Sequence, residues 1–105
     1  MSVSSITIPN TVTQLQESTF SGIVNLREIT IPDGVSVIPA ELFYGCSSLE
    51  SVKLPKALNS IDPSAFTDCH KLQNMELSNE CQTFKIMNKS IVNKNDMSLV
   101  YCYAS

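Results

Sequence analysis

A 23-residue unit recurs along this chain and restricts its fold more than any other feature. With Leu49 as position 1, steps of 23 residues bring apolar side chains to the same positions of successive units. These positions are 1 (Val3, Leu26, Leu49, Leu72), 4 (Ile6, Ile29, Val52, Met75), 6 (Ile8, Ile31, Leu54, Leu77), 10 (Val12, Val35, Leu58, Cys81), 13 (Leu15, Ile38, Ile61, Phe84), 18 (Phe20, Phe43, Phe66) and 21 (Ile23, Cys46, Cys69). Such a period is typical of a solenoid, because one unit alone cannot bury its apolar face.

Each unit predicts a short strand, an extended corner and a helical side. Apolar and polar residues alternate in the strand, which indicates that one face is buried. A proline without an N–H donor then ends the strand, at Pro9, Pro32 and Pro55. A helical or 3₁₀ turn is expected over residues 17–22, 39–45 and 62–68. The third is the clearest, because Asp62 can cap it and Pro63 can take its first helical position.

The period predicts one domain over residues 1–105, with coils at 3–25, 26–48, 49–71 and 72–87 and a terminal hairpin at 88–105. The period breaks after Phe84, since Asn95 stands where the next position-1 leucine would fall. Two short strands, Ser90–Asn93 and Ser98–Tyr103, flank a polar turn, which predicts a β-hairpin. This hairpin would cover the last coil, as solenoid ends require.

The first coil has no corresponding cover in the sequence, so its apolar flank is expected to face water. The chain is therefore expected to be part of a longer array, or to associate end to end through its N-terminal coil.

Positions 1 to 6 read LxxIxIP, LxxVxLP and LxxMxL, which resembles the strand of leucine-rich repeats. The segments ITIPDGVSVIPAELFYGCSSL and VKLPKALNSIDPSAFTDCHKL further resemble the BspA-like type, whose turns follow the pattern IxIPxxVxxIxxxAFxxCxxL. Leu42-Phe43 and Ala65-Phe66 stand at the AF position of that pattern. The resemblance covers residues 3 to about 103, and residues 84–103 fit loosely to a variant turn that runs from a strand into a hairpin.

The resemblance implies an α/β, β-rich fold. It is a right-handed leucine-rich-repeat solenoid of about four coils, with parallel strands, short helical or 3₁₀ segments on the other side and a C-terminal β-hairpin. It also implies a module of cell-surface or secreted adhesins that binds proteins and is not an enzyme. The start of this chain has no signal peptide, so a cytoplasmic location stays open. Because the family has no fixed binding residues, it assigns none here.

The outward positions of the predicted strands form the candidate binding face. In leucine-rich repeats these positions lie on the inner, ligand-facing side of the sheet. The face is polar and mixed in charge, which suits hydrogen-bonded recognition of a protein, although any solvated sheet face has this character. Its candidate residues are Ser5, Thr7, Arg27, Glu28, Thr30, Ser51, Lys53, Asn74 and Glu76.

The cysteines and the single histidine are expected to have structural roles. Cys46, Cys69 and Cys81 stand at apolar positions of the period, so they are expected to be buried, although stacking leaves a bond between Cys46 and Cys69 within reach. His70 has no second ligand pair at a zinc-binding spacing. No nucleophile has a plausible base, so no catalysis, cofactor or metal is expected.

Net charge is only −3 and the seven basic residues are scattered, which excludes a basic stripe for nucleic acid. No apolar run approaches the roughly 20 residues that a membrane-spanning helix needs. Two functions remain: a protein-binding or adhesion module that uses the strand face, or an intracellular scaffold that assembles through coil ends and edges.

Overall fold

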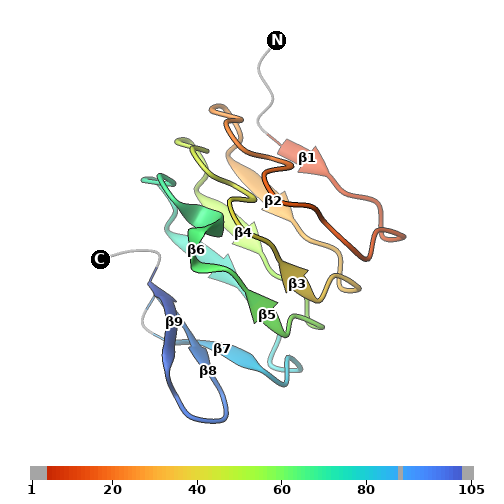
Figure 1. Cartoon of the computed structure of the whole chain (residues 1–105), viewed down its shortest axis with the longest axis vertical. Coiled ribbons are helices and arrows are strands. Elements are labelled where there is room, and N and C mark those ends of the chain that lie inside the picture. The colour runs from red at the N-terminus through yellow and green to blue at the C-terminus, as the bar shows by residue number, and fades with distance from the viewer. Residues whose placement is uncertain (1–4, 88, 103–105) are drawn as a thin grey trace.

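The computed structural model describes residues 5–87 and 89–102, and it shows a stack of coils (Figure 1). One short strand from each coil joins a parallel sheet in the order β1 (Ser5–Thr7), β2 (Glu28–Thr30), β4 (Ser51–Lys53) and β6 (Asn74–Glu76). The register pairs Ile6 with Ile29, Ile29 with Val52 and Val52 with Met75, so residues 23 apart in sequence are neighbours in space. The predicted parallel strands are confirmed. Val3, which was expected to begin the first coil, lies outside the described residues.

The opposite side of the stack contains far less helix than predicted. Two extended corners, β3 (Val37–Ile38) and β5 (Ser60–Ile61), form a second parallel pair, and a 3₁₀ helix, η1, spans Pro63–Phe66. The helical sides expected at residues 17–22 and 39–45 are turns instead, so the prediction was wrong for both. No helix in the part of the chain that the structure describes is long and apolar enough to span a membrane.

The difference between the 3₁₀ helix of the third coil and the turns of the first two arises at one position of the repeat. Ser18 and Glu41 have positive φ angles of 61° and 57°, which interrupt a right-handed helix, whereas Ser64 at the same position lies within η1. The Asp62 carboxylate accepts hydrogen bonds from the Ser64 backbone N–H at 2.9 Å and from its hydroxyl at 2.7 Å. These bonds lower the pKa of Asp62 and cap η1, as the sequence predicts for this coil.

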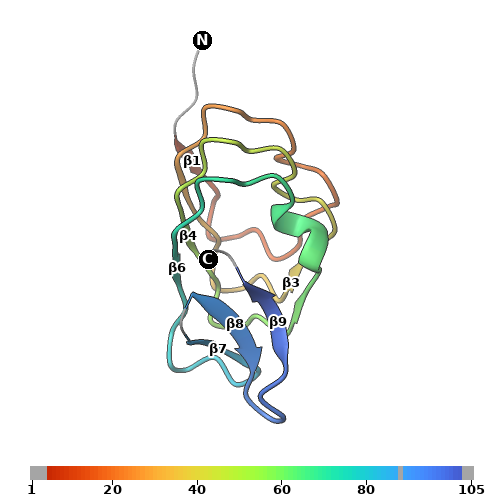
Figure 2. The ribbon, with the colours of Figure 1, turned by 90° about the vertical axis from the view of Figure 1, so that its left-hand side faces the viewer.

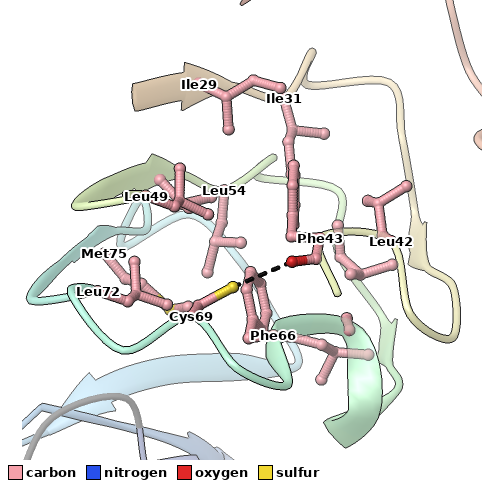
Figure 3. Close-up of a cluster of buried hydrophobic side chains, with 14 of the residues drawn as sticks. Ile29, Ile31, Leu42, Phe43, Leu49, Leu54, Phe66, Cys69, Leu72 and Met75 are labelled. Carbon is pink, nitrogen blue, oxygen red and sulfur yellow. Dashed lines mark hydrogen bonds between the residues drawn. The ribbon is translucent and has the colours of Figure 1, made fainter. Parts of the chain in front are cut away.

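Identical positions of neighbouring coils pack directly on one another in the core (Figure 3). The Phe20 and Phe43 rings stack with centroids 5.7 Å apart, and the Phe43 and Phe66 rings stack at 5.5 Å. The Cys46 and Cys69 thiols are buried and not bonded to each other. Each donates at 3.1 Å to the carbonyl of the phenylalanine in the preceding coil, Phe20 for Cys46 and Phe43 for Cys69.

The C-terminal end carries an antiparallel sheet of three strands, β7 (Phe84–Met87), β8 (Ser90–Asn93) and β9 (Leu99–Cys102). The hairpin and its first strand are confirmed, but β7 adds a strand that the period had suggested as part of the fourth coil. Tyr103, expected at the end of the hairpin, lies outside the described residues. Figures 1 and 2 show this sheet beside β6, at the opposite end of the stack from β1.

Side chains of the terminal sheet and its turns cover the last coil and form hydrogen bonds with its backbone carbonyl groups. The Tyr101 ring packs on Phe66 with centroids 5.3 Å apart, and its hydroxyl donates to the Phe66 carbonyl at 3.3 Å. Tyr101 thus takes the place that the next coil's phenylalanine and cysteine would take. The Lys89 ammonium donates to the Gln73 carbonyl at 2.8 Å, and the Lys94 ammonium donates to the Cys81 carbonyl. Because exposed backbone acceptors at a sheet edge invite pairing, these contacts close the C-terminal end.

The phenylalanine stack predicts a position-dependent loss of stability. Phe43 is fully buried between two rings, so Phe43→Ala should lower the free energy of unfolding by about 3–5 kcal/mol. Phe20→Ala changes the same repeat position in the first coil, where the ring is only partly buried, and should cost less than half as much. Urea unfolding of both variants measures the difference. Equal losses would mean that the neighbouring coils do not determine the packing energy.

Candidate functional site

The outward side chains of β1, β2, β4 and β6 form a continuous polar surface, here called the strand face. The parallel register arranges them in two rows, Ser5–Glu28–Ser51–Asn74 and Thr7–Thr30–Lys53–Glu76. All eight side chains point away from the core because residues on a strand alternate between its two faces. The residue between each outward pair packs on the core and fixes this orientation: Ile29, Val52 and Met75 are buried and Ile6 is partly buried. The structure therefore brings together the eight strand residues that the sequence singled out.

Two open hollows lie on the strand face. One, of about 430 Å³, extends across all four strands and is lined by hydroxyls and by Glu28, Lys53 and Glu76, with three isoleucines and a proline among the other lining residues. The other, of about 540 Å³, lies at the start of the strands and includes Arg27 and Asn74. Polar atoms dominate both hollows, whereas sites for drug-sized ligands are mostly apolar and enclosed. This geometry suits broad contact with a protein surface better than enclosure of a small molecule.

Arg27, the ninth predicted residue, directly precedes β2 and pairs across coils. Its guanidinium lies 3.2 Å from the Glu50 carboxylate, and both side chains are well exposed. The sequence analysis missed Glu50, although a residue of opposite charge at the same repeat position was a usable signal. Because exposed ion pairs contribute only about 0–1 kcal/mol, the pair orients Arg27 more than it stabilises the fold.

A second polar group borders the other end of the strands. The Asp33 carboxylate accepts from the Lys56 backbone N–H at 3.1 Å, and the Lys56 ammonium lies 3.8 Å from the Glu80 carboxylate. These residues share a depression with Lys53 and Glu76. The loops after the strands therefore extend the strand face with alternating charges that the sequence analysis did not select.

The cysteines and the histidine of the described residues have the following surroundings. Among residues 5–87 and 89–102, no three His, Cys, Asp or Glu side chains gather where they could hold a metal ion. Burial raises the pKa of Cys46, and it raises the pKa of Cys69 to about 12, so neither thiol forms a nucleophilic thiolate near neutral pH. His70 is exposed, with its imidazole 3.7 Å from the Asp68 carboxylate.

Comparison with known proteins identifies the repeat. A family model described as a BspA type leucine-rich repeat region of six copies matches residues 1–99. No curated protein matches the chain. A leucine-rich cell surface protein from Faecalibacterium prausnitzii is 38% identical over 68% of this chain, with a TM-score of 0.66. A leucine-rich repeat protein from Bacteroides ovatus is 36% identical over 73% of the chain, with a TM-score of 0.68.

A leucine-rich repeat protein from Eubacterium ventriosum covers 89% of the chain with a TM-score of 0.58, and at 15% identity this likeness shows the fold alone. The chain spans 19%, 20% and 37% of the length of these three structures, respectively.

The raised pKa of Cys69 predicts an alkaline loss of stability. The folded chain keeps this thiol neutral up to about pH 12, whereas an unfolded thiol with a pKa near 9.0 ionises earlier. The stabilising contribution is therefore complete below about pH 9 and is lost as pH rises toward about 12. Cys69→Ser keeps a hydroxyl donor for the Phe43 carbonyl and removes the titration.

We expect the free energy of unfolding of Cys69→Ser to fall less steeply than that of the wild type between about pH 9 and pH 11, as measured by urea unfolding. Ser47→Ala, at an exposed position without a titrating group, should keep the wild-type slope. The interpretation fails if all three proteins show the same slope.

Proposed function

Because the chain belongs to the BspA-type leucine-rich repeat family, we propose that it is a non-catalytic protein-binding or adhesion module that uses the strand face. The observation that carries this proposal is the pair of hollows across all four strands, lined mostly by polar side chains. Leucine-rich repeats typically bind proteins, and a four-stranded polar face offers them many hydrogen-bonding groups without any enclosed cavity. The residues proposed to contact the partner are Ser5, Thr7, Arg27, Glu28, Thr30, Ser51, Lys53, Asn74 and Glu76.

The charges on this face favour a partner surface that also carries both positive and negative charges. Glu28 and Glu76 carry negative charge, Lys53 lies between them on β4, and the Arg27–Glu50 pair balances its own charge. Electrostatic complementarity of this kind selects among partners more than it adds affinity. The F. prausnitzii relative is a cell surface protein, which supports a role of this chain at the surface of a cell.

A second candidate function is assembly into larger structures through the coil ends. The partly buried side chains of the first coil favour it, and the buried thiols suit a reducing compartment. This candidate function predicts that the chain still binds its partners after substitutions on the strand face.

A matched pair of variants separates the two functions. Thr30→Arg with Ser51→Arg places two large cations on adjacent strands of the strand face, inside the hollow of about 430 Å³ that extends across all four strands. Val37→Arg with Ser60→Arg places the same two cations on the paired strands β3 and β5 of the opposite side, where both residues are exposed. Immobilised wild type and both variants are then tested for retention of proteins from a cell extract and from an extracellular-matrix preparation.

The strand-face proposal expects at least a tenfold loss of retained partners for the Thr30/Ser51 variant and little loss for the Val37/Ser60 variant. Matched unfolding curves would establish that both variants remain folded. Retention of the same partners by the Thr30/Ser51 variant would reject the strand face as the binding surface.

A further inference from the structure

Three charged side chains of the strand face have no oppositely charged partner within the fold. Glu28 on β2, Lys53 on β4 and Glu76 on β6 are exposed, and none of them takes part in an ion pair among residues 5–87 and 89–102. By contrast, the Arg27 and Glu50 side chains beside them pair with each other at 3.2 Å. The fold therefore does not neutralise these three charges, and they are available to a partner.

The same three charges line the hollow that extends across all four strands. Glu28, Lys53 and Glu76 are the charged residues among its lining side chains. The sheet order β2–β4–β6 places Lys53 on the strand between the two glutamates. A partner that enters the hollow must therefore lie against an acidic, a basic and an acidic side chain, in that order.

We propose that the strand face binds an α-helical segment of a partner protein that lies across the strands and presents a basic, an acidic and a basic side chain on one face. This inference rests on the strand-face function proposed above and specifies the chemistry of the partner. Complementary charges across an interface select a partner and fix its register, whereas like charges placed opposite each other repel. The charge order of the hollow thus specifies the opposite order in the partner.

The unequal spacing of the three charges fits a helix. Adjacent strands are about 4.8 Å apart, and each residue adds about 3.3 Å along a strand. Glu28 pairs with Ser51, two residues before Lys53, so the Cα atoms of Glu28 and Lys53 are about 8 Å apart. Lys53 and Glu76 are register partners and are about 4.8 Å apart.

A helix provides one long and one short interval on the same face. Residues i and i+4 are about 6 Å apart along the helix axis, and residues i+4 and i+7 are about 4.5 Å apart. The opposite helix direction gives the same intervals at i, i+3 and i+7. An extended segment repeats a single spacing of about 6.7 Å between residues of one face, so it does not reproduce the long and the short interval together.

The side chains around the charges suit a helix surface. Ser5, Thr7, Thr30 and Ser51 contribute short hydroxyl side chains to the hollow. Short side chains allow a helix of about 10 Å diameter to approach the sheet. Each hydroxyl can donate and accept a hydrogen bond, so the hollow can also satisfy polar side chains that flank the charged ones.

Selection from a library of helical peptides tests the proposal. The probe is a library of monomeric, alanine-based helices with positions i, i+3, i+4 and i+7 randomised, selected on the immobilised whole chain. The wild type should enrich helices with Lys or Arg at i and i+7 and Asp or Glu at i+3 or i+4, at least tenfold over the reversed pattern. The variant Glu28→Lys with Lys53→Glu and Glu76→Lys should enrich the reversed pattern instead.

A matched control separates local charge from net charge. Two of the three reversals on the strand face cancel, so Glu17→Lys alone makes the same change of net charge at an exposed residue outside the hollow. This control should enrich the same helices as the wild type. Unfolding curves of both variants should match that of the wild type, since the reversed residues make no ion pair in the fold.

A charge exchange between chain and peptide gives a second readout. A helix selected by the wild type should bind Lys53→Glu at least tenfold more weakly, and replacing the acidic residue of the peptide with lysine should restore binding. Because salt screens exposed charges, the affinity of this helix for the wild type should fall at least fivefold between 0.05 and 0.5 M NaCl.

The proposal is overturned if the wild type selects no helix, if it selects helices without this charge pattern, or if the reversed variant selects the same helices as the wild type. The Thr30/Ser51 variant then distinguishes two cases. If that variant still loses its partners from the extracts, the strand-face function stands and the helical partner alone is wrong. If it keeps them, both are wrong.

Discussion

Contacts between residues one repeat apart hold this structure together. The parallel register places each residue beside its counterpart 23 positions later, and the same spacing recurs in the phenylalanine stack, the Arg27–Glu50 ion pair and the Asp33 contact with Lys56. The cysteine thiols add a contact of nearly the same range, from position 21 of one coil to the position-18 carbonyl of the coil before. Stability is therefore a sum over neighbouring coils, and a coil with one neighbour is the weakest.

Both candidate functions follow from this construction. Stacking forces the outward residue of every strand into a row with its counterparts, so the strand face exists because the core positions repeat. Stacking also leaves two ends of the described solenoid, and their side chains differ in burial and charge. The C-terminal end is covered by β7–β9, with Tyr101 in the place of a missing phenylalanine and cysteine, while the first coil shows partly buried apolar side chains and almost no charge.

Features tied to the period could be predicted from sequence, and those that depend on off-period contacts could not. The strands, the core and the eight outward residues follow from apolar spacing alone. The prediction of helical sides was wrong in the first two coils because the φ angle at one repeat position, occupied by Ser18 and Glu41, is positive and produces a turn. Composition does not specify the sign of this angle. β7 was missed as part of the terminal sheet because Phe84 also fits the period, and Lys89, Lys94 and Tyr101 reach carbonyls 13 to 35 residues away.

Hydrogen exchange of the backbone amides tests most directly whether neighbouring coils determine local stability. We expect the slowest exchange for the inner strands β2 and β4 and for the Phe43 and Gly45 amides, which donate to the next coil. Amides of the first coil, including Phe20 and Gly22, should exchange at least tenfold faster although they make the same bonds to the second coil. Equal protection of the first and inner coils would contradict the account.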